Sequence, residues 1–306
     1  MGSRIKKPKS KFRIWREYIF FSLMYRILRA LPLRWGYRLS ALGMRVFFRF
    51  SRTHSRRSFQ HVLHSGIVGT DEREARKLAK RSFVESGKLL AEIAKSDLLF
   101  RQETFVADAP ESTLDYVLAE RNPEDFRGLI MVTAHFGNWE IAGRALTGLT
   151  GRRITSLMRS FSNPKIGDLI LSHRAAPMVT LVDKKHGIRP LLRALDRREI
   201  ATVLIDQHAK QREGVVCEFF GHPARVHMTP ALLHLKTGIP IMPEVTRRLP
   251  GEDFRFAMTA GELIRKHPEQ WLWAHRHWLD INRGHDAEYA DWKPEVRLSD
   301  GEGGEG

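Results

Sequence analysis

The first feature of the sequence that could do chemistry is a histidine followed five residues later by a glutamate, within "VTAHFGNWEIAG" (Val132–Gly143). A neutral imidazole such as that of His135 can take the proton of an alcohol that attacks a carbonyl. A carboxylate beside it, here that of Glu140, helps by orienting the ring and stabilising the imidazolium. Gly137 and Asn138 favour a turn between the two residues, so their side chains can meet.

This pair predicts general-base chemistry without a covalent intermediate. No serine lies in the G-x-S-x-G surroundings of a nucleophile elbow. The expected reaction is therefore the direct attack of a bound hydroxyl, deprotonated by His135, on a bound acyl group. The alternative is that His135 is an ordinary hydrogen-bonded histidine at the end of a strand.

Metal binding is the rival chemistry for a chain with 14 histidines. The H-E-x-x-H motif is absent, and a single cysteine cannot form a cysteine cluster. His275 and His277 lie two residues apart in "HRHW", which is poor spacing for one face of a helix. The P-loop and G-x-G-x-x-G motifs of nucleotide-binding proteins are absent as well. We therefore expect neither a metal site nor a cofactor.

The elements that must position these residues alternate between strands and helices from about residue 128 onward. This order predicts an α/β domain with a mainly parallel sheet that helices cover on both faces. In such sheets, sites lie beyond the carboxyl ends of the strands. His135 follows one expected strand, and Asp206 ends another. The expected strands are 128–134, 154–158, 178–183, 200–206, 214–221, 239–245 and 253–260. The expected helices are 163–175, 187–199, 229–238 and a closing helix at 268–279.

Ahead of this domain, residues 69–96 have the signals of one long helix. Thr70 or Asp71 can cap its start. An apolar stripe along it predicts its buried face. The stripe consists of Ala75, Leu78, Ala79, Phe83 and Leu89 or Leu90.

Residues 1–60 are predicted to form a basic, helical, membrane-associated region, followed by an α/β domain at 61–300 and a flexible tail at 301–306. The apolar run Tyr18–Tyr25 is shorter than the ~20 residues that span a bilayer. Arginines on both sides of this run allow a helix seated in the membrane interface or a spanning helix with charges near its ends. A basic helix packed on the main domain is the third possibility.

The charge of the chain points to an acidic partner. With 51 Lys and Arg against 35 Asp and Glu, the formal net charge is +16. Nucleic acid, an anionic membrane surface or an acidic carrier protein would each fit. No helix-turn-helix or RNP-type signature is present, so nucleic acid is not expected. Cys217 is the only cysteine, which suits the cytoplasmic face of a membrane, and its apolar neighbours predict that it is buried.

At the level of motifs, "AHFGNWE" resembles the H-x4-D/E motif of the lysophospholipid acyltransferase superfamily. More specifically, it resembles the bacterial lipid A biosynthesis acyltransferases, which add late (secondary) acyl chains to lipid A precursors. Four further blocks are similar to those of this family and follow in the same order. They are "DEREARKLAKRSFVESGKLLAE" and "LMRSFSNPKIGDLILSHR", then "VLIDQHAKQREGVVCEFFGHPARVHMTPALLHLKTGIPIMP" and "HPEQWLWAHRHW".

The resemblance implies roles for individual residues. His135 would be the general base and Glu140 the carboxylate that orients it. An arginine such as Arg174 suits a phosphate or a developing oxyanion, and Asp206 would position that arginine or a sugar hydroxyl. The substrate-binding residues implied in this way are Arg159, Arg174, Asp206 and Gln207.

Together these observations predict an O-acyltransferase at the cytoplasmic face of the cell inner membrane. The donor would be a thioester of acyl carrier protein or, as second choice, of coenzyme A. The acceptor would be a hydroxyl of an anionic glycolipid, a lipid A precursor. One alternative is an enzyme of the same superfamily that acts on a glycerophospholipid, an aminolipid or a phosphatidylinositol mannoside. The other is a basic peripheral membrane protein without activity.

Overall fold

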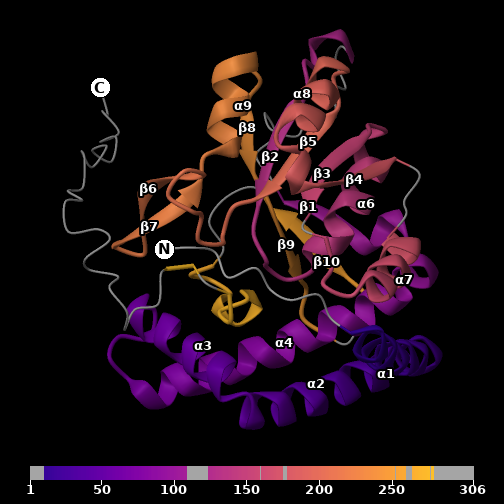
Figure 1. The fold of residues 1–306 in the computed structure, drawn as a ribbon, viewed down its shortest axis with the longest axis vertical. Helices are drawn as coiled ribbons and strands as arrows, with labels where there is room; N and C mark the ends of the chain where they lie inside the picture. The colour runs from indigo at the N-terminus through magenta and orange to yellow at the C-terminus, as the bar shows by residue number, and fades with distance from the viewer. Residues whose placement is uncertain are drawn as a thin grey trace.

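The computed structural model describes residues 10–108, 123–158, 160–174, 178–251, 253–259, 264–275 and 277–278 (Figure 1). At its centre lies a sheet of five parallel strands in the order β4-β3-β5-β2-β8. The bounds are β2 Leu129–Thr133, β3 Ile154–Met158, β4 Val179–Asp183, β5 Ile200–Leu204 and β8 Ile241–Pro243. The α/β class and the parallel sheet predicted from the sequence are confirmed.

Different helices cover the two faces of this sheet, because successive side chains of a strand point to opposite sides. Met131 of β2 belongs to a buried cluster with Ala142 of α6. Its neighbour Ile130 belongs to another, with Leu191 of α8 and Leu233 of α9. The helices that follow the strands are α6 Trp139–Thr150, α7 Pro164–Arg174, α8 Arg189–Asp196 and α9 Thr229–Thr237. Short 3-10 turns lie at η1 Gln102–Thr104, η2 Pro123–Asp125, η3 Lys184–His186 and η4 Pro268–Gln270.

A second sheet has three strands in the order β1-β10-β9, where β1 is parallel and β9 antiparallel to β10. The bounds are β1 Phe105–Asp108, β9 Val245–Arg248 and β10 Phe256–Thr259. The single strand expected over 239–245 is in fact two, since β8 belongs to the first sheet and β9 to the second. Glu244 lies at the crossing point, where its N–H still bonds the carbonyl oxygen of Val132, at 2.8 Å.

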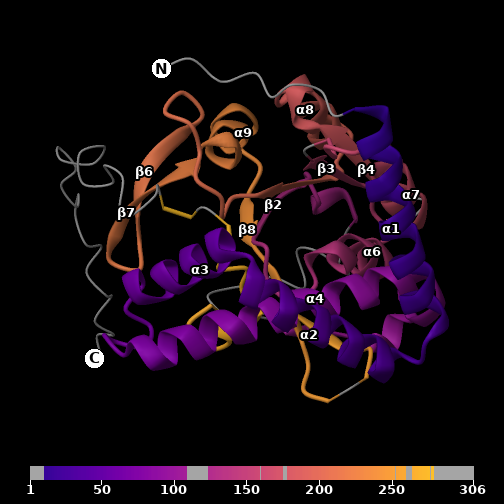
Figure 2. The same cartoon turned by 60° about the horizontal axis from the view of Figure 1, so that its bottom comes forward.

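Four helices form the N-terminal part of the described chain: α1 Lys11–Ala30, α2 Leu33–Phe50, α3 Arg52–His64 and α4 Glu72–Leu99. In both views α2 and α3 lie along α4, and α1 lies beside α7 (Figures 1 and 2). The expected cap of α4 is Asp71, whose carboxylate accepts from the N–H of Arg73 at 2.8 Å and of Glu74 at 3.0 Å. The expected apolar stripe of α4 is buried, apart from the half-buried Leu90.

Within the described residues, no helix combines the length and the apolar character needed to cross a bilayer. The division of the chain at residues 60 and 61 stays a prediction, and this boundary falls within α3. Residues 1–9 of the predicted basic region and the tail at 301–306 lie outside the described residues.

Two further expectations about the C-terminal half are wrong. Cys217 is exposed, because it lies in the two-stranded hairpin of β6 (Gly214–Phe219) and β7 (His222–His227). The closing helix at 268–279 is absent from its described part, which has only the turn η4 and then irregular chain. Trp271 and Trp273 are both buried in one region. In a helix they would point about 200° apart, whereas in extended chain residues two apart share a side.

Candidate active site

His135 lies in the loop that leads from the carboxyl end of β2 into α6. The segment that contains Trp271 and Trp273 fixes the main chain of this loop. The carbonyl oxygen of His135 accepts from the N–H of Leu272 at 3.0 Å, and Phe136 forms an isolated antiparallel bridge with Trp271. The loop is therefore bound to chain more than 130 residues away in the sequence.

The ring of His135 is held by Asp206, which follows β5 on the neighbouring strand. His135 Nδ1 lies 2.8 Å from Asp206 Oδ1. Burial alone would raise the pKa of Asp206, but the charge and the hydrogen bonds of His135 outweigh it, so this pKa is lowered. The ionised carboxylate accepts, so Nδ1 carries the hydrogen and Nε2 keeps its lone pair.

Three donors converge on the carboxylate of Asp206, whose side chain is 4% exposed. In addition to the ring of His135, the main-chain N–H of His135 donates to Oδ2 at 2.9 Å, and Trp271 Nε1 donates to the same oxygen at 3.1 Å. The ring of His277 donates to the main-chain oxygen of Asp206. These contacts fix both the position and the charge of the acid.

The side chain expected to hold His135, Glu140, lies in the first turn of α6. Its Oε1 accepts from the indole N–H of its neighbour Trp139 at 2.9 Å. That indole packs edge-on against the imidazole of His135, with 4.9 Å between ring centroids. The acid at Nδ1 is thus Asp206, for which the sequence suggested a different role. The role expected for Glu140 stays a prediction.

Gln207 and His275 lie on the Nε2 side of His135. Gln207 Nε2 is 2.9 Å from His275 Nδ1 and 3.4 Å from His135 Nε2. Burial, followed by the nearby charge of His135, lowers the pKa of His275 to about 3. A neutral His275 can accept from the amide of Gln207, which holds that amide beside the basic nitrogen of His135.

The side chains of the two predicted arginines, Arg159 and Arg174, lie outside the described part of the structure. Arg174 is the last residue of α7, and Arg159 directly follows β3 in the sequence. Substrate-binding roles for both stay predictions.

Trp271, His277 and His275 belong to the site, although spacing along the sequence did not single them out as functional. Trp271 and His277 lie 65 and 71 residues from Asp206 in the sequence, and His275 lies 68 residues from Gln207. The sequence signal for these three residues was the "WLWAHRHW" block, which is similar to a block of the family. This block was, however, expected to form a helix.

A main cavity of about 790 Å³ opens beside His135, along the carboxyl edge of the five-stranded sheet. Apolar side chains that line it include Met131, Ala142 and Leu181. Four cationic side chains line it as well: Lys184, Lys185, Lys210 and Arg212. The lining also includes two acids, Glu140 and Glu213.

The cations come from two separate connections, one after β4 and one after β5. Lys184 and Lys185 follow β4, and the same cavity is lined by His227 of the β6–β7 hairpin. The connection that carries Lys210 and Arg212 leads directly into this hairpin. Cations from both connections therefore line one cavity, which is favourable for an anionic ligand.

A second cavity of about 410 Å³ lies beside Asp206, between the hairpin and the ends of β2 and β5. Thr133 and Gln207 line both cavities. Phe219 and Phe220 make part of its wall, together with the buried acid Glu244. Burial raises the pKa of Glu244 to about 7, against the hydrogen bond that Oε1 accepts from Thr246 at 2.6 Å.

Among the residues that the structure describes, no group of three or more His, Cys, Asp and Glu side chains is arranged to hold a metal ion. The groups that the site offers for chemistry are an imidazole and an ionised acid beside two adjoining cavities. This arrangement can take a proton from a group bound in the main cavity.

Comparison with known proteins gives one family and two relatives. A family model described as bacterial lipid A biosynthesis acyltransferase matches residues 5–261. Phosphatidylinositol mannoside acyltransferase of Mycobacterium tuberculosis (strain ATCC 25618 / H37Rv) is 26% identical over 119 residues, which are 38% of this chain and 37% of that protein. The protein of the same name from strain CDC 1551 / Oshkosh has the same identity and coverage. The chain thus matches little more than a third of the length of these curated relatives.

Proposed function

The chain belongs to the family of bacterial lipid A biosynthesis acyltransferases, and we propose that it transfers a fatty acyl chain from a thioester to a hydroxyl group of a membrane lipid. The observation that carries this proposal is the hydrogen bond between His135 Nδ1 and the ionised Asp206. It leaves Nε2 as the basic nitrogen, in a side chain that lines the main cavity.

In the proposed reaction, His135 Nε2 takes the proton of the lipid hydroxyl while the hydroxyl oxygen attacks the thioester carbonyl carbon. The ester C–O bond forms and the C–S bond breaks. The departing sulfur receives the proton from His135, so a free thiol leaves and the neutral imidazole is restored. Asp206 stays ionised and stabilises the imidazolium in between.

The two cavities support a reaction of two lipid-like substrates. They adjoin at Thr133 and Gln207, next to the base. The four cations of the main cavity favour an acceptor that carries phosphate or another anionic group. We favour a lipid A precursor as this acceptor, and acyl carrier protein over coenzyme A as the carrier of the thioester. The acidic surface of a carrier protein would complement the net charge of +16.

A phosphatidylinositol mannoside or another anionic membrane lipid is the second candidate acceptor. The names of the two mycobacterial relatives favour it. Mass spectrometry of lipids from a deletion strain separates the two. Loss of one acyl chain from lipid A would support the first, whereas an unchanged lipid A and a change in another lipid class would support the second.

We further propose that the protein binds the cytoplasmic face of the inner membrane through α1 and α2. Exposed apolar side chains follow one another on each helix at intervals that place most of them on one face. Arginines on the same helices can reach anionic headgroups. The exposed residues are Phe12, Trp15, Ile19, Phe20, Leu23 and Ile27 of α1, and Trp35, Leu39, Leu42, Val46, Phe47 and Phe50 of α2.

The activity is tested with purified protein, a radiolabelled acyl carrier protein thioester and the acceptor lipid in mixed micelles. We expect the wild-type protein to transfer the label and His135→Ala to lose this activity while its thermal unfolding stays cooperative. Full activity of His135→Ala would remove His135 from the mechanism. Vesicle binding without any turnover by the wild-type protein would support the non-enzymatic alternative.

A further inference from the structure

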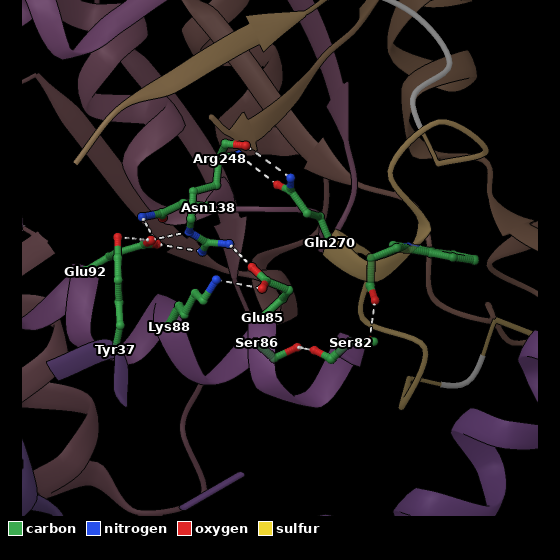
Figure 3. Close-up of polar contacts among 10 residues, drawn as sticks. Tyr37, Ser82, Glu85, Ser86, Lys88, Glu92, Asn138, Arg248 and Gln270 are labelled. Carbon is green, nitrogen blue, oxygen red and sulfur yellow. Dashed lines mark hydrogen bonds and ion pairs between the residues drawn. The ribbon is translucent and has the colours of Figure 1, made fainter. Parts of the chain in front are cut away.

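A buried ion pair lies beneath the loop that carries His135, and it lines neither of the two cavities described above. It joins Arg248 of β9 to Glu92 of α4 (Figure 3). The Glu92 side chain is fully buried and that of Arg248 is 4% exposed.

Each carboxylate oxygen of Glu92 accepts two hydrogen bonds. Oε1 accepts from the hydroxyl of Tyr37 at 2.8 Å and from Arg248 Nε. Oε2 accepts from Arg248 Nη2 and from the side-chain amide of Asn138, both at 2.9 Å. The remaining arm of the guanidinium, Nη1, donates to Glu85 Oε2 at 2.8 Å (Figure 3).

Asn138 connects the ion pair to the loop that carries His135. It is the last residue of this loop, three residues after His135. Its side-chain oxygen accepts from the N–H of Ile141 at 3.1 Å and so caps α6. Its own N–H donates to the main chain of Thr246 at 3.0 Å. The side chain is thus fixed at both ends, by the helix on one side and by Glu92 on the other.

A second connection runs from Arg248 to the same loop through Gln270. The amide of Gln270 bonds both main-chain groups of Arg248, accepting from the N–H at 2.7 Å and donating to the oxygen at 3.1 Å. The main-chain oxygen of Gln270 accepts from the N–H of Gly137 at 2.9 Å. Gly137 has φ +51, and a Cβ there would overlap the main-chain oxygen of Thr246, so this residue lies directly against β9.

A buried ion pair is weak evidence for stability, because apolar residues of similar volume often serve a protein as well. What this pair does provide is a defined geometry. His135 and Asp206 follow different strands, so their 2.8 Å contact depends on where the loop is held relative to β5.

We propose that Glu92 and Arg248 are positioning residues for the acyl transfer, acting through Asn138 and Gln270 to keep the imidazole of His135 in register with Asp206. This inference rests on the proposed function. A displacement of the reacting groups by about 1 Å can reduce a rate by about 100-fold.

The first test is Asn138→Ser, which keeps an oxygen to cap α6 but removes the amide N–H that binds Glu92. We expect kcat to fall by about 10- to 100-fold while the KM values for both substrates change little, because the lost geometry matters in the transition state. Glu92→Gln should give a similar fall, because its NH2 group would face donors from Arg248 and either Tyr37 or Asn138.

Glu85→Gln is the matched control. It lies on the same helix and binds the same guanidinium, but its other contact goes to Lys88 and not to Asn138. We expect it to lower the unfolding temperature without a comparable change in kcat. Proton NMR of the His135 Nδ1–H adds a readout independent of turnover. This resonance should be well resolved and shifted downfield in the wild type and broadened or shifted upfield in Asn138→Ser.

The proposal is overturned if Asn138→Ser keeps the wild-type kcat and the wild-type Nδ1–H resonance. It is also overturned if Glu85→Gln loses kcat to the same extent as Glu92→Gln at equal stability. If Glu92→Gln does not fold, Asn138→Ser decides alone. A wild-type protein without transferase activity would refute the proposed function, while the resonance would still test the positioning.

Discussion

Replacing Asp206 by asparagine separates the charge of the acid from its shape, and the structure fixes what the amide must do. Oδ2 accepts two hydrogen bonds, from the N–H of His135 at 2.9 Å and from Trp271 Nε1 at 3.1 Å, whereas Oδ1 accepts one, from His135 Nδ1 at 2.8 Å. The single oxygen of asparagine satisfies two donors in the Oδ2 position but only one in the Oδ1 position, so it should take the Oδ2 position. The NH2 group then faces Nδ1.

This orientation forces His135 into the other tautomer. Nδ1 becomes an acceptor and the hydrogen moves to Nε2, which can no longer take a proton from the substrate. The equivalent change in a serine protease triad lowers kcat by about 10⁴-fold. We expect a loss of that order for Asp206→Asn, about 5.5 kcal/mol in activation free energy. Because the shape of the cavity is kept, the KM values should change little.

The assay is single-turnover transfer of a labelled acyl group from its thioester, with Glu140→Gln measured alongside. The amide oxygen that this second variant introduces can still accept from the indole of Trp139, so its rate should fall by about tenfold or less. An Asp206→Asn enzyme that keeps more than about a tenth of the wild-type rate would refute the reasoning. An equal or larger loss for Glu140→Gln would make Glu140 the group that orients His135.

The cavities and the helical surface give three further predictions. Folded Glu244 binds its proton more tightly than an ordinary glutamate, so its own contribution to stability should fall by about 3 kcal/mol as the pH rises from 4.5 to about 7. The free energy of unfolding of the wild type minus that of Glu244→Gln, measured by urea unfolding at several pH values, should therefore fall by about 3 kcal/mol over this range. Lys210→Glu combined with Arg212→Glu should raise the KM for an anionic acceptor by about tenfold or more, less so at high salt, with kcat little changed in steady-state kinetics. Phe20→Glu combined with Leu23→Glu should weaken binding to anionic vesicles by about 3 kcal/mol in co-sedimentation, without lowering the unfolding temperature, since both side chains are exposed.

The strands of the central sheet could be predicted because they are short, mainly apolar runs, and the inner strands β2 and β5 are largely buried on both faces. Met131 and Ile130 of β2 face opposite helices, and both are apolar. The same runs placed His135 and Asp206 at strand ends. These positions followed from the chain alone, because the carboxyl edge of a parallel sheet collects such residues.

The pairing of those residues could not be predicted, because it depends on strand order. Spacing along the chain favoured Glu140 as the partner of His135, since the two are close in sequence. In the fold β2 lies directly beside β5, which brings Asp206 to Nδ1 from 71 residues away. Trp271 was missed for a related reason. The sequence of its segment predicted a helix, but Trp271 and Trp273 are two residues apart and both buried in one region, which requires extended chain.

The long-range hydrogen bonds of the site have a consequence for how the protein is made. Ser82 binds the main-chain oxygen of Trp271 across 189 residues, and Arg248 binds Glu92 across 156. Contacts of this separation form late and slowly during folding. A nascent chain on the ribosome, or a fragment that stops short of Trp271, would hold the imidazole and its acid without the groups that fix them. Synthesis would therefore yield an active enzyme only after the segment around Trp271 has emerged, and a release of thiol before that point of translation would contradict this order.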